Sequence, residues 1–294
     1  MEKRMMLMLT GVLAFGLLAA CSTPKESADG HGGSHQHGTT NSSANNDGPG
    51  DHGSHGGHDT GGHAADNYKA SFSFASGTAK ASENTKLNIQ VTDANGQAVH
   101  DFEWGHEKLM HLIIVNKDLS YFNHIHPEWD GKGTFTIDTS FPKGGEYKVF
   151  ADFVPKGGSG TTLSEWAKVE GETKPLESVK ADAKLVKVVD GKEVALTLSS
   201  TKAKDEATLT FTVKDEKTKE GISNLEQYLG AVGHVVILSE DAEQYLHVHP
   251  IDEKASGPAA EFMTAFPNPG TYKIWGQFQH QGKVLTVPYV VEIQ

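Results

Sequence analysis

Six histidines stand in two stretches of this chain at the same spacing. In each stretch a second histidine follows the first by 13 residues and a third by 15. These two sets, called the histidine grids below, are His111, His124 and His126 in the first and His234, His247 and His249 in the second. Neutral imidazole binds both zinc and copper well. The repeated spacing therefore predicts a duplicated unit with two metal sites of three histidines each.

A β-hairpin would bring the three histidines of a grid to one face. With an even loop centred on Lys117-Asp118, His111 stands opposite His124, and His126 follows two residues further along the same face. The second grid behaves in the same way with a loop centred on Glu240-Asp241. Three ring nitrogens could hold copper or zinc at about 2.0–2.1 Å and leave one coordination position open, which favours exchange over permanent binding.

Two other interpretations of the grids stay open. The histidines could be half-buried polar residues that cap the core, or they could belong to a surface that binds a protein partner. In the second case the chain is a non-catalytic interaction module of the cell envelope with incidental histidines. No nucleophile paired with a base, phosphate-binding loop or carboxylate dyad stands out, so we expect no enzymatic activity.

Several neighbours of the grids are weaker candidates. Asp152 could orient a ligand of the first site, although its counterpart in the second repeat is Gln277. Four more residues carry metal-binding atoms but are expected elsewhere, with Met110 and Met263 in the core and His106 and His280 facing solvent.

The amino-terminal residues are typical of a bacterial lipoprotein signal. Residues 1–20 begin with Lys3 and Arg4, continue with a short apolar run and end in small residues before Cys21. The sequence Leu18-Ala19-Ala20-Cys21 is similar to a lipobox, in which the cysteine receives a lipid anchor. We expect a protein held at the extracytoplasmic face of the cell membrane; a plain signal peptide is the alternative. No later stretch is apolar enough to cross a bilayer.

Cysteine and charge exclude several classes of function. Cys21 is the only cysteine, so a disulfide within the chain, a zinc ribbon and a blue-copper centre are all excluded. The formal net charge of -12 disfavours nucleic acid as a partner and suits a protein that attracts cations.

Composition divides the remaining chain into a tether and two domains. Residues 21–66 are rich in Gly, Ser and His and should form a disordered tether. Its histidines could collect metal loosely, or they could reflect low-complexity drift; they are His31, His35, His37, His52, His55, His58 and His63. Residues 67–172 and 173–294 alternate in the manner of strands, and each is expected to form a β-sandwich of roughly seven strands.

The two domains match along their length. Phe141-Pro142 corresponds to Phe266-Pro267, and Tyr147 corresponds to Tyr272. Asp190-Gly191, between two apolar runs, predicts a two-residue hairpin turn. The chain is therefore predicted to be all-β, with no long helix.

The stretches MHLIIVNKDLSYFNHIHPE and YLGAVGHVVILSEDAEQYLHVHP, with FPKGGEYKVFADF and FPNPGTYKIWGQF behind them, resemble a family of secreted bacterial lipoproteins. Members have tandem immunoglobulin-like domains, are grouped as YtkA-like or FixH-like, and are linked to heavy-metal handling. The chain is more loosely similar to CopC-like copper carriers. Together with the lipobox and the histidine grids, the resemblance leads us to expect a membrane-anchored protein that captures, buffers or delivers copper or zinc, with a metal transporter or acceptor protein as a candidate partner.

Overall fold

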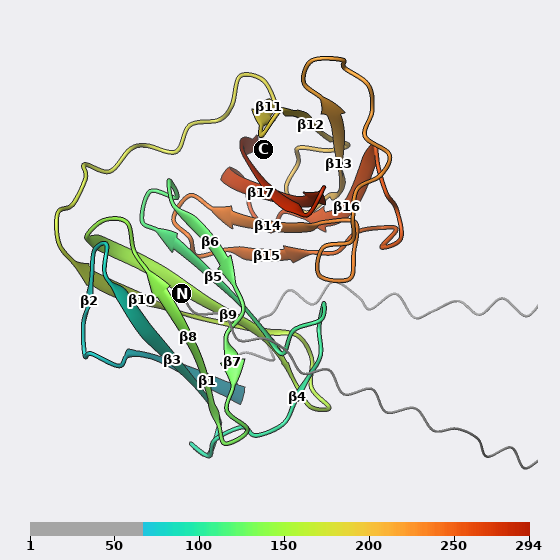
Figure 1. Ribbon diagram of the computed structural model, residues 1–294. Coiled ribbons are helices and arrows are strands. Elements are labelled where there is room, and N and C mark those ends of the chain that lie inside the picture. Colours follow the sequence, from blue (N-terminus) through green and yellow to red (C-terminus); the bar gives the residue numbers. More distant parts are fainter. Residues whose placement is uncertain (1–66) are drawn as a thin grey trace, which may run out of the picture. The chain divides into compact units, whose positions relative to one another are not determined.

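The computed structural model describes residues 67–294, in which the regular secondary structure is β-strand and the strands are joined by turns and loops. The strands of each half gather into their own pair of antiparallel-dominated sheets (Figure 1). The prediction of an all-β chain with two tandem β-sandwich domains is confirmed. The described residues contain no helix that is long and apolar enough to span a membrane.

The first half contains ten strands. One sheet has the order β1-β3-β8-β7, and the other has the order β2-β10-β9-β5-β6, with β4 paired to β9. The strands are β1 (Tyr68–Phe74), β2 (Ala79–Lys80), β3 (Asn84–Asp93), β4 (Phe102–Glu103), β5 (Met110–Asn116), β6 (Phe122–Ile125), β7 (Glu128–Trp129), β8 (Thr134–Ser140), β9 (Gly145–Pro155) and β10 (Thr161–Glu170).

The second half contains eight strands. Its sheets have the orders β11-β12-β13-β16 and β15-β14-β17-β18. The strands are β11 (Val186–Val189), β12 (Lys192–Leu198), β13 (Glu206–Asp215), β14 (His234–Ser239), β15 (Tyr245–Val248), β16 (Ala259–Ala265), β17 (Gly270–His280) and β18 (Lys283–Ile293).

Matching contacts support the equivalence of the two halves. The Tyr147 hydroxyl donates to the Lys143 carbonyl at 2.9 Å, and the Tyr272 hydroxyl donates to the Asn268 carbonyl at the same distance. The ring of Tyr147 meets Phe141 at 4.8 Å, and that of Tyr272 meets its partner phenylalanine at 5.0 Å. The repeat seen in the sequence is thus a repeat of structure.

Each sandwich has its own core, and a third apolar cluster joins the two halves. Strand β3 alternates buried and exposed residues, as expected where one face meets the core. Strand β5 is instead buried on both faces: Leu112 and Ile114 pack in the first core, while Ile113 and Val115 pack in the shared cluster. Strand β14 behaves in the same way, so the two halves meet through β5 and β14.

Candidate metal centre

The first histidine of each grid lies on the face that meets the other repeat. His111 is in phase with Ile113 on β5, and His234 is in phase with Val236 on β14, because side chains alternate along a strand. Both histidines are buried, at 4% and 2% exposure. The contact between the halves therefore carries both grids toward each other.

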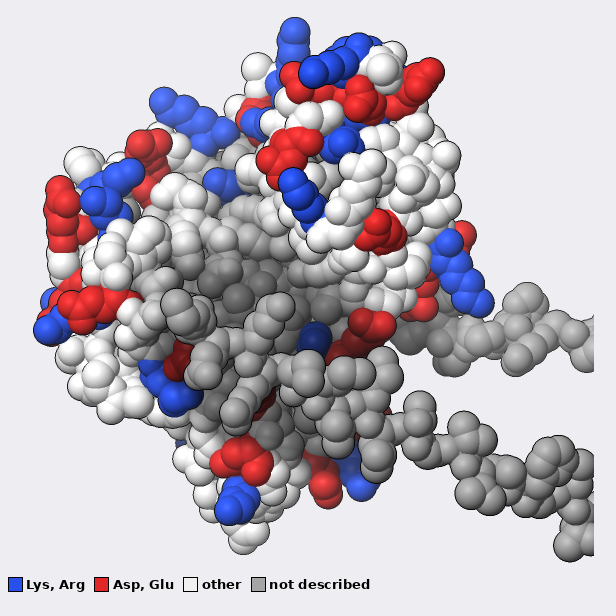
Figure 2. Space-filling model, viewed as in Figure 1, with Lys and Arg blue, Asp and Glu red and all other residues white. Residues whose placement is uncertain are grey.

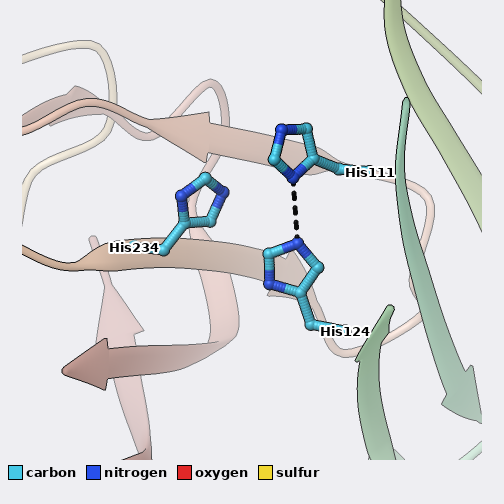
Figure 3. Close-up of side chains that lie close together, drawn as sticks. All are labelled: His111, His124 and His234. Carbon is cyan, nitrogen blue, oxygen red and sulfur yellow. Dashed lines mark hydrogen bonds between the residues drawn. The ribbon is translucent and has the colours of Figure 1, made fainter. Parts of the chain in front are cut away.

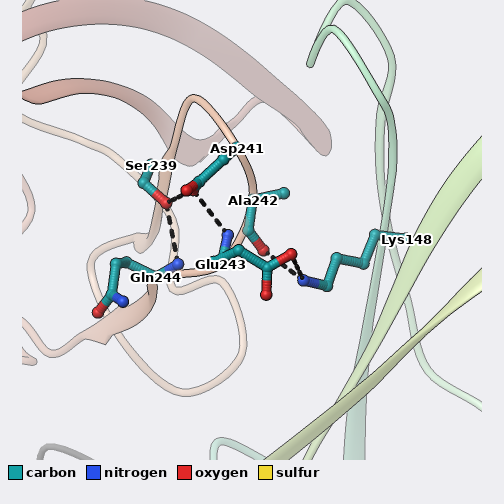
Figure 4. A network of polar contacts seen from close by, with 6 residues as sticks. All are labelled: Lys148, Ser239, Asp241, Ala242, Glu243 and Gln244. Carbon is teal, nitrogen blue, oxygen red and sulfur yellow. Dashed lines mark hydrogen bonds and ion pairs between the residues drawn. The ribbon is translucent and has the colours of Figure 1, made fainter.

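Two lysines fix this contact in a reciprocal way. Lys148 of β9 donates from Nζ to the Ala242 carbonyl at 2.8 Å, in the hairpin loop of the second half. Lys273 of β17 donates from Nζ to the Leu119 carbonyl at 2.7 Å, in the hairpin loop of the first half. Lys148 also pairs with Glu243 Oε1 at 2.7 Å, within a polar network around the loop (Figure 4).

Two aromatic pairs cross the contact between the halves in the same reciprocal way. Phe122 stacks on Trp275 with centroids 4.6 Å apart, and Phe150 stacks on Tyr245 at 5.1 Å. In an isologous interface, such as that of a two-fold dimer, each residue pair occurs twice because the two sides contribute the same surface. The interface is thus pseudo-two-fold within one chain, and equivalent residues near its axis meet each other.

The hairpins keep the histidines on one face but in a different register from the prediction. Leu112 pairs with Ile125 and Ile113 with His124, so His124 is not opposite His111. The prediction of a loop centred on Lys117-Asp118 is wrong by one residue in its centre. The same correction applies to the second hairpin, where Val236 is opposite His247.

The cause is the turn. Leu119 donates its amide to the Asn116 carbonyl and adopts φ of 56°, a left-handed residue that lengthens the turn. Ala242 repeats this with Ser239 and φ of 58°. The register shifts by two residues rather than one, so the predicted face is retained.

The two grids converge on one cluster. His111, His124 and His234 each offer one ring nitrogen, and these three atoms lie within 4.8 Å of one another (Figure 3). His111 and His234 are equivalent residues, and their rings stack 5.2 Å apart at 20°. This geometry could hold a metal ion. It differs from the prediction of two separate sites, because one histidine of the group comes from the other repeat.

Hydrogen bonds outside the cluster set the tautomers of two of these histidines. His111 Nε2 lies 3.0 Å from the Gly105 carbonyl, which can only accept, so Nε2 donates and, in the neutral ring, Nδ1 carries the lone pair. Gln277 donates from Nε2 to Thr286 Oγ1 at 3.1 Å. Its Oε1 therefore accepts from His124 Nδ1 at 2.6 Å, and His124 Nε2 carries the lone pair.

The two lone-pair nitrogens point at each other. His111 Nδ1 and His124 Nε2 lie 3.1 Å apart, and His126 Nε2 lies 3.2 Å from the same His111 atom. Nitrogens of a tetrahedral site with bonds of 2.0–2.1 Å stand roughly 3.3 Å apart. Ligating histidines also donate their second ring N–H to a carbonyl or carboxylate, as His111 and His124 do here to a carbonyl and an amide oxygen. The arrangement suits a cation between the rings.

His126 has an environment that keeps it neutral. Burial is the main cause that lowers the pKa of His126 to about 3, and repulsion from His111 when that ring is protonated, and from Lys108, lowers it further. A neutral imidazole keeps its lone pair for a metal.

The two remaining histidines of the second grid differ in what the structure describes. His249 is exposed, and its Nδ1 lies 2.9 Å from His106 Nε2. His247 lies on β15, and its side chain is outside the described part of the structure. The expectation that His106 faces solvent is wrong, since it joins the cluster from the turn before β5. His280 is also buried, at 8% exposure, with its Nε2 3.3 Å from Asn224 Oδ1.

The structure also shows where the other weak candidates lie. Asp152 and Gln277 are opposite His111 and His234 in their sheets. The expected role of Asp152 as a partner of the first site thus goes to Gln277 of the other repeat, through its bond to His124. Met110 is fully buried in the core as predicted, whereas Met263 is 38% exposed, which corrects its assignment.

The pattern of apolar residues along β5 and β14 could have revealed this interface from the sequence. The runs in β5 and β14 are continuously apolar, which is typical of strands buried on both faces. The predicted signal peptide (1–20), the predicted lipidation of Cys21 and the predicted tether (21–66) lie outside the described residues.

The chain belongs to the family described as Domain of unknown function (DUF8832), which matches it twice, over residues 63–171 and 187–294. No curated protein is significantly similar. Among solved structures, the Escherichia coli adhesin FdeC is 16% identical with a TM-score of 0.26, over 76% of this chain and 64% of that one.

Two other solved structures are similarly distant. Invasin, a bacterial integrin-binding protein, is 13% identical with a TM-score of 0.22, over 76% of this chain and 39% of invasin. A putative membrane-anchored protein from Corynebacterium diphtheriae is 9% identical with a TM-score of 0.23, over 78% and 57%. The chain spans less than two thirds of the length of each of these three proteins.

Proposed function

We propose that this protein is a membrane-anchored, extracytoplasmic lipoprotein that captures, buffers or delivers copper or zinc. The observation that carries the proposal is the 3.1 Å approach of two ring nitrogens, His111 Nδ1 and His124 Nε2, whose tautomers are both set from outside the cluster. Two lone pairs at this distance repel each other unless a proton or a metal ion lies between them. Both metals accept imidazole, so the ligand set alone does not choose between them.

The ligand set favours exchange. Three imidazoles with one open position resemble catalytic or transport sites more than closed structural ones. No thiolate is present to hold the metal permanently, because Cys21 is the only cysteine of the chain. An acidic protein with a formal net charge of -12 attracts cations, and the face seen in Figure 2 shows basic and acidic side chains interspersed.

The rival proposal is an interaction module of the cell envelope with incidental histidines. It requires the histidines of a grid to lie apart. His111 and His124 point at each other instead (Figure 3). His126 of the same hairpin also lies close, with its Nε2 3.2 Å from His111 Nδ1. Incidental polar residues would not need two tautomers fixed in opposite senses by a carbonyl and a glutamine.

Metal titration tests the binding proposal. The background is a full chain whose tether histidines are replaced, called the tether-substituted chain below. Its changes are His31→Asn, His35→Asn, His37→Asn, His52→Asn, His55→Asn, His58→Asn and His63→Asn.

Zn²⁺ and Cu²⁺ are titrated into this chain against a chelator of known affinity. We expect His124→Ala with His126→Ala to weaken binding by at least tenfold. His100→Ala, which removes an exposed histidine beside Gly133, is the matched control and should leave binding unchanged. Equal affinity in all three chains would refute the site.

The location is tested separately. Cells that produce the full chain are grown with labelled palmitate and then fractionated. We expect label on the protein and recovery in the membrane fraction, and we expect Cys21→Ala to remove both. Unlabelled protein in the soluble fraction from both chains would refute the lipid anchor while leaving the metal site untouched.

A further inference from the structure

An open groove lies at the end of the interface that carries the two hairpin loops. It has a volume of about 380 Å³ and is called the linker groove below. Its walls are the two loops at Asp118 and Asp241, the linker residues 176–179 between β10 and β11 (Figure 1), and Trp166 of β10. Strand β5 separates it from the histidine cluster, because the far end of this strand lies roughly 17 Å from His111 at a rise of about 3.3 Å per residue.

Large apolar side chains form one wall of the linker groove and stay open to water. Trp166 is 36% exposed and Leu176 is 63% exposed. Val179 lies below them, where it packs against the apolar cluster that joins the two halves. Exposed apolar surface with a polar rim is typical of a site that binds another molecule. This wall therefore indicates a partner with an apolar part.

Carboxylates outnumber cations around the groove. Of the nine residues that line it, one is a lysine and four are acidic: Asp118, Glu177, Glu240 and Asp241. The lysine, Lys117, is paired with Glu146 Oε2 at 2.7 Å, and the neighbouring Lys148 is paired with Glu243 Oε1 at 2.7 Å. The two glutamates of the lining are exposed and form no ion pair within the described residues. The charge of the groove thus complements a cationic partner.

The groove borders an open edge of the sheet. Strand β10 pairs with β9 on one side, and on the other side β2 covers it only at Val169 and Glu170. The Glu170 carbonyl accepts from the Ala81 amide at 2.8 Å, away from β9. Trp166 is in phase with Glu170, so its N–H and C=O also face away from β9. No strand of residues 67–294 pairs with this part of the edge, which can therefore accept another strand.

The second half shows how chain covers the equivalent edge. Val290 of β18 is the repeat equivalent of Trp166, because their cross-strand partners Lys273 and Lys148 are equivalent. The Val290 amide donates to Asp182 Oδ2 at 2.9 Å, and the Val290 carbonyl accepts from the Asp182 amide at 2.9 Å. The linker thus occupies the edge in the second half. The repeat shows that a chain segment outside the sheet fits against this backbone position.

We propose that the linker groove binds an extended, basic segment of a partner protein. The segment hydrogen-bonds to the edge of β10 at Trp166 and places a lysine or arginine side chain among the carboxylates of the groove. Backbone bonds at an open edge, with pockets for alternate side chains, are the basis of recognition by strand addition. The apolar stem of the basic side chain covers Trp166 and Leu176 while its charged end reaches the carboxylates. The proposal does not depend on the histidine cluster.

Isothermal titration calorimetry of the full chain with short synthetic peptides tests this proposal. The probe is acetyl-Gly-Lys-Thr-Val-Thr-Lys-Gly-amide, whose two lysines and valine share one face of an extended strand. We expect saturable binding of this peptide. We expect at least tenfold weaker binding when glutamates replace its lysines, because like charges repel, and at least tenfold weaker binding when its five central amides are N-methylated, because the edge then loses its donors.

A pair of charge variants locates the binding. Glu177→Gln with Glu240→Gln should weaken the lysine peptide at least tenfold, since it removes the two carboxylates of the groove that have no ion pair within the described residues. The matched control is Glu165→Gln with Glu253→Gln, which removes two exposed carboxylates outside the groove and should leave the affinity unchanged. Both chains should keep the urea midpoint and the Zn²⁺ affinity of the parent.

Each contrary outcome overturns the proposal. No saturable binding of the lysine peptide at millimolar concentration would refute the docking of a basic segment. An equal affinity for the glutamate peptide, or an unchanged affinity in the Glu177→Gln, Glu240→Gln chain, would place the binding elsewhere. An equal affinity for the N-methylated peptide would refute strand addition at β10. Spermidine that binds as tightly as the peptide would assign the groove to a small amine instead.

Discussion

Gln277 should control metal affinity although it does not touch the metal. Its Oε1 accepts the His124 Nδ1 proton at 2.6 Å, and its side chain is 5% exposed. This bond holds His124 in the tautomer whose Nε2 points at His111. Replacement by an apolar residue of similar length, Gln277→Met, removes the acceptor and leaves the His124 N–H without this partner.

The expected loss of metal affinity follows from the loss of the hydrogen bond between His124 and Gln277. Removal of a partner that orients a ligating histidine typically lowers metal affinity by 10–100-fold, which corresponds to about 1.4–2.7 kcal/mol. A buried polar group left unsatisfied costs the metal-free protein a further ~1–3 kcal/mol. Gln277→Glu has the opposite effect on affinity, because a carboxylate accepts the same proton and makes the imidazole more basic.

The assay is a competition titration of Zn²⁺ on the tether-substituted chain, paired with urea unfolding of the metal-free protein. Gln279→Met is the matched control, since Gln279 lies two residues further along β17 and contacts Glu226 instead. An affinity of Gln277→Met equal to that of the control would show that His124 does not bind the metal through Nε2. A lower stability with an unchanged affinity would have the same meaning.

Four further predictions concern pH and the interface. Because the pKa of His126 is lowered to about 3 in the folded state, the unfolded chain binds more protons between there and about pH 6.5, so the metal-free fold should lose stability in urea titrations as pH falls through this window. Because folded His126 stays neutral down to about pH 3, proton competition at this ligand should weaken metal binding only as the pH approaches that value, and a loss of its contribution between pH 7 and pH 5, measured against His126→Ala, would contradict this. Lys148→Met leaves the Ala242 carbonyl unsatisfied and should cost about 1–3 kcal/mol in urea unfolding, whereas Lys117→Met removes only an exposed ion pair and should cost at most about 1 kcal/mol. Gly233→Ala places a methyl group 2.7 Å from the Gln277 carbonyl oxygen, so it should destabilise the fold by about 1–3 kcal/mol and weaken Zn²⁺ binding by shifting the start of β14; unchanged unfolding and binding would contradict this packing argument.

Turn chemistry marks the limit of what the sequence predicts about the hairpins. Asp190-Gly191 forms the predicted two-residue turn, with φ of 47° and 72°, because these residue types tolerate the left-handed region. The two hairpins that carry the grids use Leu119 and Ala242 in that region instead. Neither residue type signals a left-handed position, so the register could not be read from composition.

The strand face that carries each grid could be predicted from the sequence, although the register of its hairpin could not. A hairpin whose register changes by two residues keeps every side chain on its face, and the period of two along a strand is insensitive to the details of the turn. The repeat was predictable for a similar reason, since Tyr147 and Tyr272 make the same local contact in each half. Contacts within a repeat are encoded nearby in the chain, whereas His106 reaches His249 only through the packing of two domains.

The partner of each grid depends on what covers the second face of β5 and β14. In a lone sandwich that face would meet water, and an alternating pattern of polar residues would be expected. Here Ile113 and Val115 lie in phase with His111 and are fully buried against the other half. An apolar patch of this kind is unstable in water unless it is covered, and a second copy of the same patch in the same chain supplies the cover. Burial of the apolar residues beside each grid therefore places that grid near the pseudo-two-fold axis of the interface. Two half-clusters in the sequence thus become one cluster in the fold, and its ligands depend on the interface as much as on the spacing of the histidines.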